Sequence, residues 1–191
     1  LFHSDPLRRR ILSALNISLL VQHVLSNVTE QNTERLTPVF DEENPIGATG
    51  LMRTWYTTKP CFPTTKSHIS HLVGDSAWEG HAANVFEKRE DVLAYAKNGH
   101  LGFQIYYMWA GSRRRYVPDF VVRLAGGTIL ALEIKGTDSP QNKAKRDALN
   151  EWVKAINAAG GFGRWAWDVA FKPSEVQDII TKHAAVAESA E

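Results

Sequence analysis

The chain opens with a stretch in which apolar side chains recur at every fourth position. Ser4 or Asp5 can cap a helix at this point, and Pro6 suits its first turn. The apolar positions that share one face are Leu7, Ile11, Leu15 and Leu19. The pattern predicts a helix to about Asn27, with an apolar face that needs a partner surface.

From residue 31 to about residue 66 the sequence is polar and contains prolines, as in Thr37-Pro38, Asn44-Pro45 and Lys59-Pro60. Such a stretch predicts an irregular connector, and it is longer than a compact loop usually is. We therefore expect residues 1–30 to be the end of a preceding domain, 31–66 to be the connector and 67–191 to form the main domain. The start at Leu1 without a methionine is typical of a piece of a larger polypeptide.

A stronger helix signal begins at Asp75. Ser76 can cap this helix, and Asn98-Gly99 can end it. The apolar residues in between are Trp78, Ala82, Val85, Phe86, Leu93 and Tyr95. The sequence therefore predicts one helix that reaches from Ser76 to the residues before Asn98.

Three β-branched and aromatic runs follow, over residues 101–109, 115–124 and 128–135. Residues 110–112 and 125–127 separate them and are typical of hairpin turns. A helix is expected from about Ser139 to Ala159, a strand from Arg164 to Ala170 and a last helix from Pro173 to about Ala184. The order α-β-β-β-α-β-α predicts an α/β fold in which helices flank a central mixed sheet as an α/β/α sandwich.

The composition limits the classes of function. At 191 residues and 43% hydrophobic, the chain suffices for one sizeable core. Its 22 Lys and Arg against 21 Asp and Glu give a charge of +1, so any surface for nucleic acid must be local. A single cysteine, Cys61, cannot form an internal disulfide, and neither a signal peptide nor a membrane-spanning run is evident, so we expect a reducing, cytoplasmic setting.

Candidate chemistry lies in the three expected strands. Asp119 precedes Glu133 by fourteen positions, and Lys135 follows Glu133 by two, so Glu133 and Lys135 share one face of a strand. A three-residue loop around Gly126 would place Asp119 opposite Glu133 on that face, whereas a two-residue turn would separate them unless a bulge intervened. The chemistry therefore predicts an odd turn or a bulge.

Two neighbouring carboxylates repel each other unless a cation compensates them. Mg²⁺ prefers a few carboxylates, waters and phosphate oxygens, so Asp119, Glu133 and the Ile134 carbonyl make a plausible half-shell, with Mn²⁺ as a substitute. Lys135 can orient a water or neutralise charge, which indicates phosphodiester hydrolysis. The alternative is a strand with solvated alternating charges. The apolar neighbours Leu130 to Leu132 argue against it, because unpaired charges in a buried strand cost free energy.

Several segments also resemble the C-terminal endonuclease domain of the restriction (Res) subunits of type III restriction enzymes and related helicase-nucleases. They are Tyr-Val-Pro-Asp-Phe at 116–120, Leu-Glu-Ile-Lys-Gly at 132–136, the stretch from Lys145-Arg146 through Glu151-Trp152-Val153 to Gly163-Arg164-Trp165-Ala166, Thr64 to His68 and Asp75 to Glu79. The resemblance covers roughly residues 50–185. It implies a PD-(D/E)XK nuclease with a restriction-endonuclease-like fold.

The resemblance also implies partners. A helicase motor precedes the nuclease in such chains, and a methyltransferase subunit reads the DNA sequence. This sequence contains no phosphate-binding loop and no DEAD-like box, so ATP is not expected to bind it. Glu79 matches an acidic residue that such nucleases often carry before the sheet, as a metal ligand. Its alternative role is in a capping box, in which its side chain reaches the Ser76 backbone N–H.

Gln141 and Lys145 resemble the glutamine-containing motif of RecB-like nucleases and are candidates to hold a phosphate or to position Lys135. Basic side chains at Lys143, Arg146 and the Arg113 to Arg115 run are candidates for DNA backbone contacts. For all of them, an ordinary solvated surface is the alternative. Trp165 and Trp167 are expected in the core, and His68, His71, His81 and His100 are expected to be structural or exposed.

The sequence thus predicts a Mg²⁺-dependent endodeoxyribonuclease module. Its main rival is a catalytically inactive nuclease fold that binds DNA or docks a partner. Glycoside hydrolysis by the carboxylate pair is disfavoured, because no aromatic sugar platform is linked to the pair.

Overall fold

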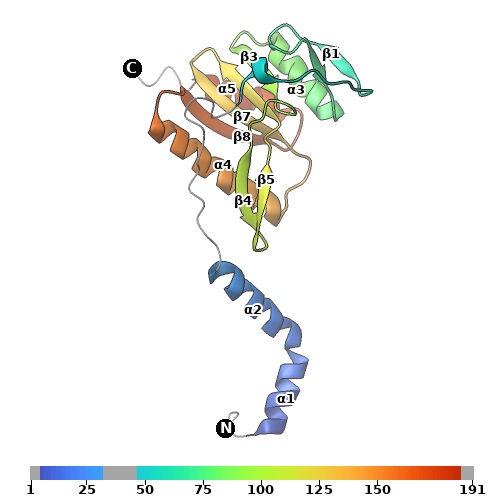
Figure 1. Ribbon diagram of the computed structural model, residues 1–191, viewed down its shortest axis with the longest axis vertical. Coiled ribbons are helices and arrows are strands. Elements are labelled where there is room, and N and C mark those ends of the chain that lie inside the picture. Colours follow the sequence, from blue (N-terminus) through green and yellow to red (C-terminus); the bar gives the residue numbers. More distant parts are fainter. Residues whose placement is uncertain (1–4, 32–46, 186–191) are drawn as a thin grey trace.

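In the computed structural model, which describes residues 5–31 and 47–185, a four-stranded mixed sheet forms the centre of the main domain (Figure 1). Its strands are β3 (Val92–Lys97), β6 (Phe120–Leu124), β7 (Thr128–Ile134) and β8 (Arg164–Ala170), in that order across the sheet. The strand β6 is antiparallel to both of its neighbours, β3 and β7, and β8 runs parallel to β7. The expected mixed sheet is therefore confirmed.

Helices cover both faces of this sheet. On one face, α3 (Ala77–Lys88) and α5 (Glu175–Ala185) pack against Phe120, Val122 and Leu132. On the other, α4 (Pro140–Ala159) packs with Ala131, Trp165 and a separate hairpin. That hairpin consists of β4 (Ile105–Trp109) and β5 (Ser112–Tyr116). The chain is a mixed α/β protein with three layers.

Several boundaries agree with the hydrophobic pattern. Ser139 caps α4 by accepting the Asn142 backbone N–H at 3.2 Å, Gly160 ends the helix, and β8 has the expected bounds. Trp165 is buried and Trp167 packs against the same core cluster, as expected. The last helix begins two residues after Pro173.

The single helix expected from Ser76 to the residues before Asn98 is wrong. The helix α3 ends at Lys88, and Leu93 and Tyr95 lie in β3. Arg89 leaves the helix in an extended conformation and pairs with Asp91, and the Val92 N–H donates to the Arg89 carbonyl at 3.3 Å, so the chain turns here toward β3. Tyr95 is only 3% exposed, because β3 is covered by α3 on one face.

The strand expected over residues 115–124 is also wrong, because it is two strands. Val117 and Pro118 separate β5 from β6, and the two strands belong to different sheets. A proline has no backbone N–H for a strand ladder and restricts the residue before it, so the chain changes direction here. Asp119 follows this bend directly.

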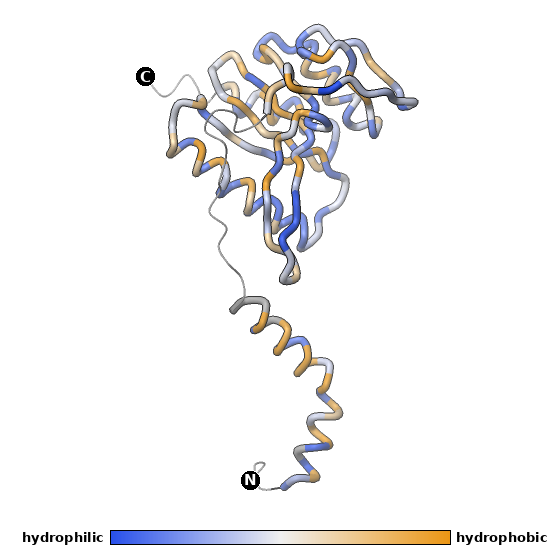
Figure 2. The backbone as a smooth tube through the Cα atoms, in the orientation of Figure 1, coloured by the Kyte–Doolittle hydropathy of each residue, from blue (hydrophilic) through white to orange (hydrophobic). Residues whose placement is uncertain are grey.

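The β4–β5 hairpin turns through Ala110 and Gly111, both of which have positive φ. A two-residue turn of this kind matches the twist of the strands it joins. The strand β5 carries Arg113 to Arg115 and stands out as hydrophilic in Figure 2.

The N-terminal stretch forms two helices, α1 (Pro6–Leu15) and α2 (Ile17–Gln31), where one was expected. Asp5 caps the first, and Asn16 ends it by donating from its side chain to the Leu12 carbonyl at 2.8 Å. A short polar side chain competes in this way with the helical hydrogen bonds. The apolar side chains of both helices are exposed, and no helix in the described part of the chain is long and apolar enough to cross a bilayer.

Of the expected connector, residues 32–46 lie outside the described residues, and residues 47–66 contain more structure than expected. They include a 3₁₀ turn, η1 (Thr49–Leu51), and β1 (Cys61–Pro63), which pairs with β2 (His71–Val73). Thr65 and Lys66 bind the Glu87 carboxylate through their backbone N–H groups. This part of the chain therefore packs on the main domain.

Candidate metal centre

The turn between β6 and β7 decides where the two acids lie. Arg123 pairs with Ile129 and Phe120 pairs with Leu132, so three residues, 125–127, form the loop. Gly127 has a φ of 79° and donates to the Leu124 carbonyl at 3.0 Å, which closes the turn. The expected odd turn is confirmed. One step beyond the last pair, Asp119 is in register with Glu133, and residues opposite each other in antiparallel strands share a face.

Asp119 is fixed by the end of the neighbouring strand. Its Oδ2 accepts the Ile134 backbone N–H at 2.7 Å. Among the described residues, its Oδ1 accepts no hydrogen bond. Because the N–H and C=O of a strand residue face the same neighbour, the Ile134 carbonyl also points to the Asp119 side. The Asp119 carboxylate and the Ile134 carbonyl therefore lie on the same side of β7.

Glu133 is 8% exposed and lies on the face covered by α4 and the hairpin. Tyr116 donates its hydroxyl to Glu133 Oε2 at 3.0 Å, and Lys135 Nζ donates to Oε1 at 3.1 Å. Glu133 and Lys135 therefore share a face, as their spacing predicts. The backbone of Lys135 is held by the Ala170 carbonyl at 2.9 Å, so both neighbouring strands fix the end of β7.

The electrostatics of the pair follow from burial. Burial and the charges of Glu133 and Glu79 raise the pKa of Asp119 to about 7, although the Ile134 N–H and Lys135 oppose this shift. Burial, followed by Glu133, also raises the pKa of Tyr116, so this phenol stays protonated and donates. Three carboxylates that act on one another in a partly dry site favour a cation.

Glu79 lies at the start of α3 with its side chain almost fully buried. Its Oε2 accepts the Asp75 backbone N–H at 2.8 Å and Lys97 Nζ at 2.7 Å. The capping box is thus altered: Ser76 Oγ accepts the Glu79 N–H at 3.3 Å, but Glu79 reaches the Asp75 N–H rather than that of Ser76. Within the described residues, Glu79 Oε1 accepts no hydrogen bond, so the capping role leaves one oxygen for another ligand.

The donor set fits a hard divalent cation that keeps part of its hydration shell. Asp119 Oδ1 accepts no hydrogen bond within the described residues, and the charges of Glu133 and Glu79 both act on this carboxylate. In residues 5–31 and 47–185, no three His, Cys, Asp or Glu side chains converge into a ready-made metal cage. Mg²⁺ is bound through one or two carboxylates, waters and substrate phosphates rather than by such a cage.

The basic and amide residues expected near the site divide into two groups. Lys145 lies over the Tyr116 ring at 5.4 Å, and burial together with the nearby Lys135 lowers its pKa. Gln141 lies on the same helix but donates to the Tyr107 hydroxyl at 2.7 Å, so it contacts the hairpin rather than Lys135. Arg146 binds Asp138 through both terminal nitrogens, at 2.7 and 2.8 Å.

The remaining basic side chains are exposed. Lys143 lies on the open side of α4, and Arg115 donates weakly to Gln104 at 3.4 Å. Arg113 lies over the Tyr106 ring at 4.0 Å. They form a basic rim along the β4–β5 hairpin and the first turns of α4.

Sequence reasoning gave no role to three polar residues at the site. Tyr116 was visible only as the first residue of the Tyr-Val-Pro-Asp-Phe segment, three positions before the acid. Asp75 was visible only as the start of a helix signal and of the Asp75 to Glu79 segment. Its pairing with Lys97 could not be predicted, because it depends on β3, which the hydrophobic pattern did not reveal.

Comparisons with known proteins add no family assignment. A scan against protein-family models, a search of the curated proteins and a search of the solved structures each find no match to this chain.

Proposed function

We propose that this chain is a Mg²⁺-dependent DNA nuclease domain of the PD-(D/E)XK class. The observation that carries the proposal is the three-residue β6–β7 turn, which puts Asp119 in register with Glu133, beside Lys135. The α/β/α layering and the placement of the acids at the end of two central strands support a restriction-endonuclease-like fold. The resemblance to type III restriction subunits supports the same conclusion.

In this proposal, Asp119, the Ile134 carbonyl and Glu133 would hold the ion, with Glu79 as a further candidate ligand. The bound ion supplies Lewis-acid stabilisation of the charge that develops on the scissile phosphate. The protein's own part is orientation. Tyr116 and Lys135 hold the two oxygens of Glu133, and the Ile134 N–H holds Asp119, so little reorganisation is needed during reaction.

Lys135 has a second role in this reading. Its ammonium group lies 3.1 Å from Glu133 Oε1 and is partly exposed, so its remaining protons can be donated to a phosphate oxygen. Lys145 lies near enough to Lys135 for their charges to interact. Two cations at this place favour the binding of a negatively charged phosphate group over that of a neutral substrate. Water is expected to be the nucleophile, since the described site offers no residue arranged for covalent catalysis.

DNA is the proposed substrate because basic side chains lie in a row along two neighbouring elements next to the site. Lys143 and Lys145 lie on α4, and Arg113 to Arg115 lie on the adjacent hairpin. Separated cations along one rim fit a phosphate backbone better than a single phosphate group. A helicase motor in the same full-length chain and a methyltransferase partner belong to this proposal through the family resemblance. A cytoplasmic setting belongs to it through the single cysteine, Cys61.

The decisive experiment is Mn²⁺ titration by calorimetry, with Asp119→Asn as the test variant and Asp178→Asn as the control. Asparagine keeps an acceptor for the Ile134 N–H, and Asp178 is exposed on α5, away from the carboxylates. We expect binding to wild type and to the control, and at least a tenfold loss with Asp119→Asn. Equal Mn²⁺ affinity in all three proteins would contradict the metal centre.

Cleavage is tested separately with supercoiled plasmid and Mg²⁺. Lys135→Ala should abolish nicking while Mn²⁺ still binds, because the lysine contacts Glu133 and is not itself a metal ligand. The rival reading is a DNA-binding or docking module without catalysis, and the lack of a three-residue metal cage in the described residues favours it. Wild-type protein that binds duplex DNA but neither metal would support that rival.

A further inference from the structure

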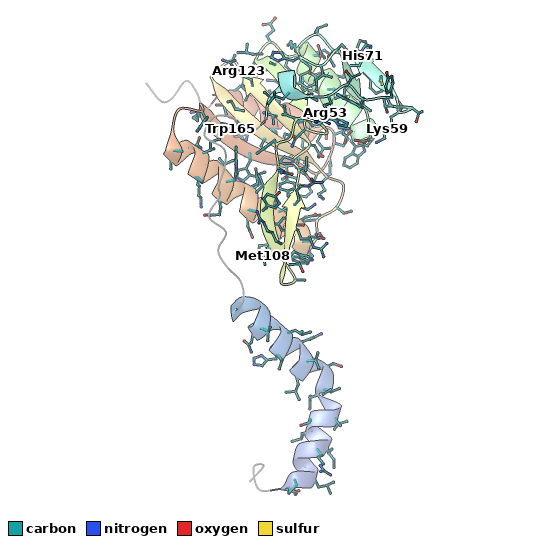
Figure 3. All side chains as sticks on the ribbon, in the orientation of Figure 1. Arg53, Lys59, His71, Met108, Arg123 and Trp165 are labelled. Atoms are coloured by element: carbon teal, nitrogen blue, oxygen red, sulfur yellow. The ribbon has the colours of Figure 1, made fainter. Side chains whose placement is uncertain are left out.

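A second concave site lies beside the proposed metal centre. It is a pocket of about 310 Å³ between residues 52–59 on one side and β2, Lys97 and His100 on the other. This volume is at the low end of the roughly 300–1,000 Å³ that is typical of small-ligand sites. Figure 3 labels Lys59 and His71, which line the pocket, and Arg53 next to it, at the end of the domain that contains β1 and α3.

Aromatic rings form part of the pocket wall. Trp55 stacks on His100 with ring centroids 4.1 Å apart and an interplanar angle of 22°. The neighbouring Tyr56 is 98% exposed, although it lines the same pocket. A stacked pair beside a solvent-facing ring offers flat apolar surface for another planar group.

On one side of the pocket, residues 52–59 are held in place by polar contacts, not by regular secondary structure. Thr49 Oγ1 lies 3.0 Å from His68 Nδ1, which fixes the start of residues 49–59. Lys59 pairs with Asp75, and Asp75 pairs with Lys97. The segment that carries Trp55 and Tyr56 is therefore pinned at both ends.

A single lysine connects the pocket to the metal centre. Lys97 Nζ lines the pocket and donates to the Val73 carbonyl at 2.8 Å and to Glu79 Oε2 at 2.7 Å. Glu79 in turn is close enough to raise the pKa of Asp119. A group bound in the pocket would therefore lie next to the carboxylates, separated from them by one ion-paired side chain.

We propose that this pocket binds one unpaired nucleobase of the DNA strand near the scissile phosphate. The rings supply stacking, the hydroxyl groups of Thr57 and Ser67 in the pocket lining can still donate to the base edge, and Lys59 supplies a cation for the backbone. A base inside a duplex is covered by its neighbours, so a concave pocket of this size accepts a base only after it leaves the stack. This inference rests on the proposed function, because it assumes that the substrate is DNA.

The test is fluorescence anisotropy with labelled dT10 in EDTA, so that neither metal nor cleavage is needed. Three proteins are compared: wild type, Tyr56→Ala and Tyr56→Phe. Because Tyr56 is almost fully exposed, neither variant should disturb folding, and circular dichroism checks this. We expect Tyr56→Ala to weaken binding at least fivefold, in line with the usual contribution of one stacked base, and Tyr56→Phe to bind like wild type.

A matched abasic oligonucleotide separates the base from the backbone. It has the same phosphates without bases, so it should bind weakly and equally to all three proteins. Equal affinity of wild type and Tyr56→Ala for dT10 would overturn the proposal. The proposal would also be overturned if free dTMP bound as tightly as dT10 and lost affinity in the same variant. The pocket would then bind a free nucleotide and not a base of a DNA strand. A negative Mn²⁺ titration would remove the nuclease function without changing these binding results, so the two failures are distinguishable.

Discussion

The carboxylate pair should make the metal-free protein less stable than it would be without Asp119. The substitution Asp119→Asn keeps the shape of the side chain and an acceptor for the Ile134 N–H. It removes one charge from a site in which burial and the neighbouring acids oppose ionisation. We therefore expect the variant to be more stable than wild type in EDTA at neutral and alkaline pH.

The size of this stabilisation follows from the difference in the pKa of Asp119 between the folded and the unfolded protein. The pKa of Asp119 is about 7 in the folded protein, against an ordinary value of 3.8. Between these two values the folded state holds a proton that the unfolded state has released, so wild-type stability falls as the pH rises through this window. Each pKa unit corresponds to about 1.4 kcal/mol, which sets an upper limit of about 4 kcal/mol above pH 7. Local relaxation and water should reduce the measured gain of Asp119→Asn to about 1–3 kcal/mol.

The assay is urea unfolding of wild type and Asp119→Asn in EDTA at pH 5 and pH 8.5. The stabilisation by the variant should be small at pH 5 and largest at pH 8.5. Saturating Mn²⁺ should then reverse the order, because a ligand that binds only the folded state stabilises wild type. A variant that is less stable at pH 8.5 in EDTA, or a difference that is the same at both pH values, would refute this account of the site.

Three further predictions concern positions around the site. Burial opposes ionisation of Asp168, but hydrogen bonds from His183 and a neighbouring lysine lower the pKa of this carboxyl group to about 2. The ionised carboxylate therefore contributes stability that is complete above its ordinary pKa of 3.8 and is lost as the pH falls through about 2. Asp168→Asn should therefore cost about 1–2 kcal/mol in urea unfolding at pH 7 and about a third of that at pH 2.5. Tyr116→Phe should cost about 1–3 kcal/mol in the same assay, because buried Glu133 loses a hydrogen-bond donor, and an unchanged unfolding midpoint would contradict this. Gly163→Ala should lower the melting temperature, because this residue has a φ of 79° and a methyl group there would lie 3.2 Å from a side chain of β7. A melting temperature equal to that of wild type would argue against this backbone conformation.

Elements with both a periodic pattern and a clear end signal could be predicted from the sequence. The helix α4 has Ser139 before it and Gly160 after it, and β8 is an apolar run between glycines and a proline. The candidate acids could be predicted for a related reason. The requirement that Asp119 and Glu133 share a face demanded an odd turn, and the chain has one.

The parts that could not be predicted depend on contacts that are distant in sequence. The strand β3 follows α3 without a glycine or proline, and its apolar residues continue the helical spacing. The segment is held as a strand by its pairing with β6, which lies far along the chain, and no local pattern reveals this pairing. The pocket beside the metal centre depends on the pairing of Lys59 and Lys97 with Asp75, and residues 49–59 have no periodicity to read.

The register of β6 against β7 determines both which apolar side chains are buried and where the two acids lie. Val122 and Leu124 are fully buried on one face, and Asp119 belongs to the other face of the same extended segment. A slip of one residue would exchange the two faces, so it would carry both apolar side chains into the wrong layer while it parted the acids. A turn one residue longer than Ala125–Gly127 should therefore destabilise the fold itself. Mutations in this turn should rarely give a folded protein in which only the positions of the two acids have changed.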